Sequence, residues 1–257
     1  MMKVIVLSAG QGKRLLPLTE DRPKCALMLG ERTVLGWQLE AFAAAGATEV
    51  VVATGFRAGL IGQLIDGYAK LDVRTAHNPF YAHCDNLGTC WVVRHEMTDP
   101  FVIVNGDTLF EPEIFARLIN SPEEHPITLV TNVKDSYDDD DMKVIVSGNE
   151  LKQVDKKLPA SEVHGESIGM IRFQGDGPRL FRERLESMMA VESTLGRWYL
   201  SAIDALAAQG YVGVVTTGSH DWCEIDDRKD LEHARTTVPL WFRRRLSAEE
   251  RLAGAIR

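Results

Sequence analysis

The stretch Val4-Ile5-Val6-Leu7-Ser8-Ala9-Gly10-Gln11-Gly12-Lys13-Arg14-Leu15 decides the fold, because a short apolar run leads directly into a glycine-rich loop. A loop of this kind after a buried strand can bring backbone N–H groups close to phosphate oxygens. A dinucleotide fingerprint would need a third glycine where Leu15 stands. A P-loop would need glycine instead of Leu7 and Ser or Thr instead of Arg14. Neither common phosphate-binding motif therefore fits this loop.

Strands and helices alternate through the first half of the chain. After the strand at 4–7, further strands are expected at 50–54, 101–105 and 126–133, and helices at 34–45, 58–68 and 111–119. Strands that alternate with helices of this length predict parallel βαβ units. We therefore expect an α/β fold with a doubly wound, mostly parallel sheet covered by helices on both faces.

The pattern changes after about residue 134. Strands at 142–146, 151–154 and 167–173, separated by turn residues, predict an antiparallel insertion. Helices at 178–188 and 197–208, a strand at 211–217 and a helix at 229–236 follow, before a basic, helix-prone tail. The chain is therefore divided into residues 1–134, residues 135–237 and a helical tail, 238–257.

Composition limits the classes of function. The 257 residues are 45% hydrophobic and 26% charged, which is ordinary for a globular protein with a sizeable core. No apolar run reaches the about 18 to 20 residues of a membrane helix. The net charge of −8 argues against a nucleic-acid partner, and the four cysteines show no CxxC spacing. We expect a reduced, cytoplasmic protein with neither a membrane nor a nucleic-acid partner.

The continuation of the loop is more specific. It reads Arg14-Leu15-Leu16-Pro17-Leu18-Thr19, followed by Arg22-Pro23-Lys24. It resembles the signature of the nucleotidyltransferase superfamily that makes nucleotide-sugars and related activated alcohols: A-G-x-G-x-R-L-x-P-L-T, then P-K. Ser8 and Lys13 depart from the usual Ala and Ser or Thr. The resemblance implies a Rossmann-like, glycosyltransferase-A-like domain over residues 1–237, with a nucleotide-binding half (1–134) and an acceptor-binding half (135–237).

The chemistry of that family explains the cations. Nucleotidyl transfer brings an acceptor oxyanion to the α-phosphorus of an NTP and expels pyrophosphate, so fixed positive charges are needed. We assign Arg14 to the β- and γ-phosphates, Lys24 to the α-phosphate and the acceptor phosphate, and Lys156 to the acceptor phosphate. The resemblance also implies that the nucleotide lies near Ala9, Gly10, Gln11, Gly12, Lys13, Thr54, Gly55, Asn86 and Gly106. For Asn86, a plain helix N-cap is an equal alternative.

Three carboxylates predict a metal site. Asp107 follows Asn105-Gly106 at the carboxyl end of an expected parallel strand, where ligands bind in such sheets. In Trp222-Cys223-Glu224-Ile225-Asp226-Asp227, Glu224 and Asp226 share one face of an extended segment. Hard oxygen ligands suit Mg²⁺, and the resemblance implies that Asp107 and Asp226, with Glu224 close by, hold it. The alternative is that Asp226 or Asp227 caps the next helix, a role that suits Asp227 better.

The acceptor half is less clearly patterned. The run Asp138–Asp141 is either a solvated face or, at Asp141, an attraction for a cationic acceptor. Tyr137, Trp198 and Tyr199 could offer aromatic faces to an ammonium group, or could simply pack in the core. Glu166 also matches a family position and is expected to contact ribose or acceptor.

The resemblance is strongest to cytidylyltransferases like those that use phosphocholine, through Thr54-Gly55-Phe56 and Asn78-Pro79-Phe80-Tyr81. The favoured hypothesis is Mg²⁺-dependent transfer of CMP from CTP to a small phosphorylated alcohol or phosphonate, such as phosphocholine or 2-aminoethylphosphonate. One alternative is a sugar-1-phosphate nucleotidyltransferase that uses UTP, dTTP or GTP. Another is a non-catalytic nucleotide-binding regulatory module. The tail is expected either to pack on the body or to form a homodimer contact.

Overall fold

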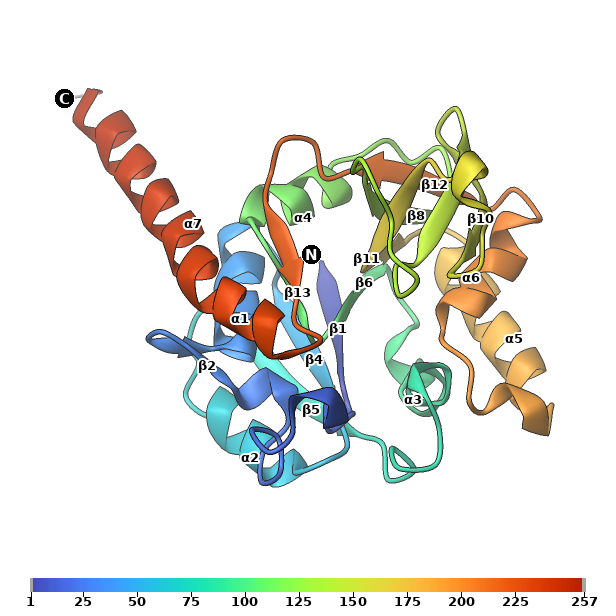
Figure 1. The fold of residues 1–257 in the computed structure, drawn as a ribbon, viewed down its shortest axis with the longest axis horizontal. Helices are drawn as coiled ribbons and strands as arrows, with labels where there is room; N and C mark the ends of the chain where they lie inside the picture. The colour runs from blue at the N-terminus through green and yellow to red at the C-terminus, as the bar shows by residue number, and fades with distance from the viewer. Residues whose placement is uncertain (1, 256–257) are drawn as a thin grey trace.

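The computed structural model describes residues 2–255, with side chains described as far as residue 245. Its centre is a nine-stranded mixed sheet with the order β5-β4-β1-β6-β11-β8-β12-β10-β9 (Figure 1). Helices cover both faces of this sheet, each face with its own apolar cluster. The predicted α/β class with a doubly wound sheet is confirmed.

The first half of the sheet is parallel. The strand β1 (Lys3–Ser8) pairs in parallel with β4 (Glu49–Thr54) and with β6 (Phe101–Asn105), and β4 pairs in parallel with β5 (Asp72–His77). The predicted strands at 4–7, 50–54 and 101–105 are therefore confirmed. The edge strand β5 was not predicted, because it is largely exposed or half-buried and lacks an apolar run.

The second half adds antiparallel strands to the same sheet. The long strand β11 (Gly165–Phe173) runs antiparallel between β6 and β8 (Ile127–Asn132). Beyond β8 lie β12 (Val212–Thr216), which is parallel to it, and the hairpin of β10 (Glu150–Asp155) and β9 (Lys143–Ser147). The predicted antiparallel insertion thus extends the central sheet instead of forming a separate layer.

The helices divide between the two faces. Against one face pack α1 (Val34–Ala44), α2 (Ala58–Ile65) and α4 (Pro112–Ile119). Against the other pack α3 (Asn86–Val92), α5 (Gly177–Met189) and α6 (Leu200–Ala207). The Thr33 hydroxyl caps α1 by accepting a hydrogen bond from the Gly36 N–H at 3.0 Å.

Two small sheets and a long helix complete the fold. The hairpin β2 (Met28–Leu29) and β3 (Arg32–Thr33) precedes α1, while β7 (Thr108–Phe110) pairs antiparallel with β13 (Trp222–Glu224). The helix α7 (Arg228–Ala255) follows, and its far end projects from the body in Figure 1. Among the described helices, none has the length and hydropathy needed to cross a bilayer.

The proposed boundary at residue 237/238 falls inside α7. Val238 and Trp241 are buried in a third apolar cluster, and the rings of Trp37 and Phe242 lie 4.8 Å apart. The beginning of the tail therefore packs on the body, as one of the two alternatives predicted.

Candidate active site

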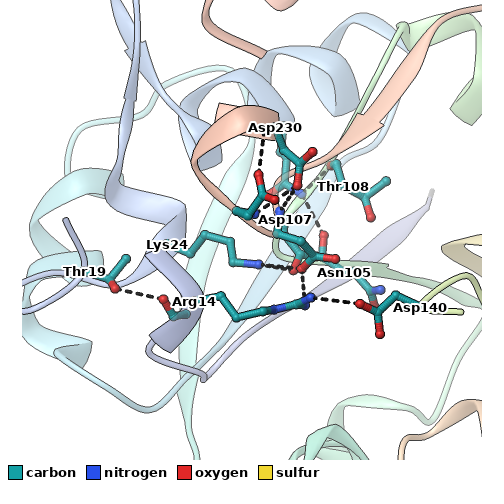
Figure 2. Close-up of polar contacts among 12 residues, drawn as sticks. Arg14, Thr19, Lys24, Asn105, Asp107, Thr108, Asp140 and Asp230 are labelled. Atoms are coloured by element: carbon teal, nitrogen blue, oxygen red, sulfur yellow. Dashed lines mark hydrogen bonds and ion pairs between the residues drawn. The ribbon is translucent and has the colours of Figure 1, made fainter. Parts of the chain in front are cut away.

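The glycine loop folds around Lys24. Gly12 has φ 76°, a left-handed conformation that favours glycine, and a Cβ there would lie 3.2 Å from the Lys24 Cβ. The Thr19 hydroxyl donates to the Gly12 carbonyl at 2.9 Å, and the Gln11 amide donates to the Thr19 carbonyl at 3.1 Å. These contacts close the loop into a compact turn that aims Lys24 and Arg14 toward the acidic residues (Figure 2).

Three carboxylates converge opposite these cations. Asp107, Glu224 and Asp226 each offer an oxygen, and these oxygens all lie within 4.8 Å of one another. The pairing of β7 with β13 sets Glu224 opposite Thr108, and the Ile225 N–H donates to the Asp107 carbonyl at 3.2 Å. Two segments more than a hundred residues apart in the sequence are thereby joined at one site.

The cations sit directly on this acidic group. The Lys24 Nζ lies 2.7 Å from Asp107 Oδ2 and 3.3 Å from Asp226 Oδ1, with its side chain 15% exposed. Arg14, which is 58% exposed, donates to Asp226 at 2.5 Å. The partly buried lysine therefore offsets part of the negative charge of the carboxylates in the free protein, while Arg14 contacts Asp226 from the solvent side.

The pKa of Glu224 is shifted because this carboxyl is buried and the three carboxylates lie close together. Burial first, and then the negative charges of Asp107 and Asp226, raise the pKa of Glu224 to about 8, although Lys24 and Arg14 oppose the shift. Three hard oxygen donors that repel one another at this separation fit a divalent cation such as Mg²⁺.

The two adjacent aspartates have different roles. Asp227 Oδ1 accepts hydrogen bonds from the N–H groups of Lys229 at 2.7 Å and Asp230 at 3.0 Å, which caps α7. The Asp226 side chain instead contacts Arg14 and Lys24. The capping alternative therefore applies to Asp227.

A cavity of about 1010 Å³ connects these groups to the acceptor half. Among the residues singled out from the sequence, it brings together Arg14, Lys24, Asn86, Asp107, Asp141, Lys156, Glu166, Trp198, Tyr199, Glu224 and Asp226. Smaller adjoining hollows are lined by Ala9 and Gly10, and by Gly10, Gly12 and Gly106. Gln11, Lys13, Thr54, Gly55 and Tyr137 do not line these cavities.

Thr54 and Gly55 lie at the end of β4 and pack against the start of the glycine loop at Ala9. Thr54 is 1% exposed, and a Cβ at Gly55 would lie 2.6 Å from the Ala9 carbonyl oxygen and 2.4 Å from the Tyr81 Cβ. The next N–H, of Phe56, donates to that carbonyl at 2.9 Å. Glycine is therefore required here for close packing of two strand ends.

Asn86 is not an N-cap. The cap of α3 is Asp85, whose carboxylate accepts a hydrogen bond from the Asn86 N–H at 2.6 Å. The Asn86 side chain instead accepts a hydrogen bond from the Tyr199 N–H at 2.7 Å, which ties α3 to the start of α6 at the edge of the cavity.

In the acceptor half, two carboxylates converge on a lysine that the sequence patterns did not single out. The Lys134 Nζ lies 2.8 Å from both Asp141 and Glu166, and the Asn132 amide donates to Glu166 at 3.0 Å. Burial raises the pKa of Glu166. Burial also acts against ionisation of Asp141, but hydrogen bonds from Lys134 and the Asp138 N–H outweigh it, so the pKa of Asp141 is lowered. The only sequence signal for Lys134 was its place just after a predicted strand.

The aromatic residues differ in their surroundings. Trp198 is 43% exposed, and the Lys156 Nζ lies 4.5 Å from its ring centroid. Tyr199 is 1% exposed and its hydroxyl donates to Asn105 Oδ1 at 3.3 Å, so it packs as a core residue. The Tyr137 hydroxyl accepts a hydrogen bond from the Lys134 N–H at 3.2 Å.

Comparison with known proteins agrees with this geometry. The chain matches the MobA-like NTP transferase domain over residues 4–253, and it belongs to that family of nucleotidyltransferases. It is 22% identical to the CTP:phosphoglutamine cytidylyltransferase of Campylobacter jejuni, over 90% of this chain and 98% of that protein. It is 29% identical to the choline-phosphate cytidylyltransferase of Streptococcus pneumoniae, over 43% of this chain and about half (47%) of that protein.

The fold is also shared with solved structures. The inositol-1-phosphate CTP transferase from T. maritima superposes with a TM-score of 0.77 at 18% identity, covering 92% of this chain and 95% of that one. Its membership of the MobA-like family makes this protein an enzyme of the nucleotidyltransferase class. Enzymes of this family generally use a divalent metal, and the acidic triad described above offers a place for one.

Proposed function

We propose that this enzyme transfers CMP from CTP to a small phosphorylated alcohol or a phosphonate and releases pyrophosphate. The observation that carries the proposal is the convergence of Arg14 and Lys24 with three carboxylates in one cavity. With a divalent cation held by the carboxylates, these side chains would offset much of the charge of a triphosphate, and the cavity of about 1010 Å³ would leave room for a second anion. The first half, 1–134, would hold the nucleotide, and 135–237 would supply the acceptor side.

The nucleotide would lie along the glycine loop. Gly10, Gly12 and Gly106 line a hollow beside Lys24, where backbone N–H groups can approach phosphate oxygens closely. Ala9 and Gly10 share a second hollow with Asn86, which we assign to base and ribose. A pyrimidine needs only a few backbone and amide partners, and this narrow space suits CTP.

The cations perform the electrostatic part of the reaction. Arg14 would hold the β- and γ-phosphates and Lys24 the α-phosphate, and Lys156 would orient the acceptor anion. The acceptor oxygen is already ionised near neutral pH, so it needs no general base when it bonds to the α-phosphorus. The bond from that phosphorus to the bridging oxygen breaks, and pyrophosphate leaves with the electron pair.

We propose Mg²⁺ as the metal, with Asp107, Glu224 and Asp226 as its holders. When bound, it would neutralise charge on the phosphate oxygens during transfer. Lys24 contacts two of these carboxylates in the free protein, so its ammonium must share them with the metal or turn toward the phosphates.

The acceptor would bind between the acidic turn and the aromatic side chain of the second half. Lys156 lies 3.2 Å from Asp140 and against Trp198, so a phosphate or phosphonate entering here would meet a lysine whose carboxylate partner is exposed. Asp141 and Glu166 lie deeper in the same cavity and give it an acidic wall suited to the polar end of the acceptor.

A pyrophosphate-release screen tests the proposal. CTP, UTP, dTTP and GTP would each be paired with phosphocholine, 2-aminoethylphosphonate, inositol phosphate and hexose-1-phosphates in the presence of Mg²⁺. Turnover with CTP and an alcohol phosphate or phosphonate is expected. Turnover confined to hexose-1-phosphates with another NTP would establish the sugar-nucleotide alternative instead. Tight NTP binding without any turnover would favour a regulatory module.

A further inference from the structure

A buried glutamine outside the active-site cavity holds the turn that carries Asp107. Gln38 lies in α1 and is 0% exposed. Its Nε2 donates to the Asn105 carbonyl and to the Thr108 carbonyl, both at 2.8 Å. These two residues bracket Gly106-Asp107, so one amide group fixes both ends of the turn. Figure 2 shows Asn105, Asp107 and Thr108 together at this point.

At Gly106 the turn packs closely on the end of β1. The Gly106 N–H donates to the Leu7 carbonyl at 3.0 Å, and a Cβ on Gly106 would lie 2.1 Å from the Ser8 Oγ. The Thr108 hydroxyl donates to the Ile168 carbonyl at 3.0 Å. The turn is therefore pressed on β1 from one side and held by Gln38 from the other, which leaves the Asp107 carboxylate little freedom.

The hydrogen bond from Gln38 to Thr108 also affects the position of Glu224. Thr108 is the β7 residue paired with Glu224 of β13. Holding the Thr108 carbonyl therefore fixes the register at which Glu224 approaches Asp107. Two of the three carboxylates depend on the position of one glutamine that touches neither of them in the described structure.

In the described structure, the amide oxygen of Gln38 has no partner, which indicates that the two hydrogen bonds from Gln38 to the turn serve function more than stability. Within the described residues, Gln38 Oε1 is buried without a hydrogen-bond partner, which is unfavourable for stability. Turning the amide over would set that oxygen against two carbonyl oxygens, so the orientation is determined by the turn. An apolar side chain would avoid the orphan oxygen but could not hold the turn.

We infer that Gln38 is a positioning residue for the divalent-metal site, and this inference rests on the proposed role of Asp107 and Glu224. Metal sites need their ligands held close to the binding geometry, and groups behind the ligands commonly control metal affinity by about 10- to 100-fold. Gln38 acts through the backbone of the turn, not by contact with substrate or metal.

The test measures metal binding without nucleotide. Gln38→Met keeps an unbranched side chain of similar length but donates nothing. Gln174→Met is the matched control, because Gln174 is 7% exposed and donates to the His125 carbonyl at 3.3 Å, outside the active-site cavity. Mn²⁺ would be titrated into each full-length protein, with free Mn²⁺ followed by electron paramagnetic resonance and folding by near-ultraviolet circular dichroism.

We expect Gln38→Met to raise the Mn²⁺ dissociation constant at least tenfold and Gln174→Met to change it less than twofold. The Mg²⁺ concentration for half-maximal pyrophosphate release should rise in parallel, with kcat largely recovered at saturating Mg²⁺. Equal Mn²⁺ affinity in folded Gln38→Met and wild type would overturn the inference, as would equal weakening in both variants. If Gln38→Met does not fold, Gln38→Asn, whose shorter amide cannot span both carbonyls, is judged by the same criterion.

Failure of the proposed function gives a different result. A wild-type protein that binds no Mn²⁺ and releases no pyrophosphate would refute the metal site and the positioning role together. A wild-type protein that does both, beside a Gln38→Met variant that behaves identically, would refute the positioning role alone.

Discussion

Replacing Lys24 with methionine removes the charge at the centre of the site and keeps most of the side-chain stem. The ammonium that is lost lies 2.7 Å from Asp107 and 3.3 Å from Asp226, on a side chain that is 15% exposed. In the proposed reaction it would exchange these carboxylates for oxygens of the α-phosphate and the acceptor. Its contribution is therefore expected in the transition state, where negative charge is most concentrated.

The expected magnitude follows from the number of contacts. Hydrogen bonds to charged groups contribute about 1.5 to 3 kcal/mol each, and a preorganised donor to a transition-state oxyanion about 3 to 4 kcal/mol. A loss of about 4 kcal/mol corresponds to a decrease of roughly 10³-fold in kcat/KM. Because Lys24 is one of the groups that lower the pKa of Glu224, the pKa of that carboxyl should rise further above about 8 in the metal-free variant.

The assay is pyrophosphate release at saturating Mg²⁺, compared with Lys3→Met. Lys3 is a suitable control because its side chain is 17% exposed and its ammonium also lies between two carboxylates, 3.8 Å from Glu49 and from Glu96, outside the cavity. Lys3→Met should keep kcat/KM within about twofold to threefold of wild type. Added Mg²⁺ should not rescue Lys24→Met, since the missing charge faces phosphate. A folded Lys24→Met variant with near-normal kcat/KM would refute the reasoning.

Three further predictions follow from charges in the structure. Burial and nearby carboxylates raise the pKa of Glu224 to about 8, and only the ionised carboxylate binds metal, so Mn²⁺ affinity should increase from pH 6 to pH 8 and level off above. Glu224→Gln should abolish this increase, and an Mn²⁺ affinity that does not change with pH in the wild type would contradict the prediction. Asp226→Asn should lower kcat at least 100-fold. Asp227→Ala, which removes the helix cap, should lower the melting temperature slightly and leave activity intact; equal losses of activity would count against the assignment. Hydrogen bonds from Arg74 lower the pKa of Glu96, so this ion pair should stabilise the fold above pH 4.5 and lose its contribution as the pH falls through the lowered pKa. Glu96→Gln should lower the free energy of unfolding by about 1 kcal/mol at pH 7 and by less at pH 3, as urea titrations at the two pH values would show.

Local patterns in the sequence predicted the parallel half of the fold because its strands are buried on both faces. Val4, Val50 and Val102 are all fully buried, and runs of such residues have the same appearance wherever they lie in the sheet. The edge strand β5 lacks that signal, since its polar residues face solvent, and α3 is only seven residues long. The strand β5 was therefore missing from the predicted elements, and the helix α3 was indicated only by Asn86 at its start.

The acidic triad could be predicted from local sequence because Asp107 and Asp226 each belong to a short motif. Lys134 and Gln38 belong to none, and their roles arise only when distant segments meet. Gln38 donates to residues that lie 67 and 70 positions further along the chain. An apolar helix with one glutamine gives no sign that the glutamine holds a turn in another βαβ unit.

The acceptor half shows how tertiary structure changes the meaning of a charge run. From the sequence, Asp138–Asp141 was either a solvated face or an attraction for a cation. In the structure, Asp141 and Glu166 converge on Lys134, which already supplies a positive charge at the point where a cationic acceptor would find two carboxylates. An acceptor ammonium would have to share these carboxylates with Lys134 or displace it, whereas an uncharged polyol phosphate would not. We therefore propose that selectivity between these two kinds of acceptor would depend on Lys134, which lies outside the acidic run, since the carboxylates alone would favour any cation.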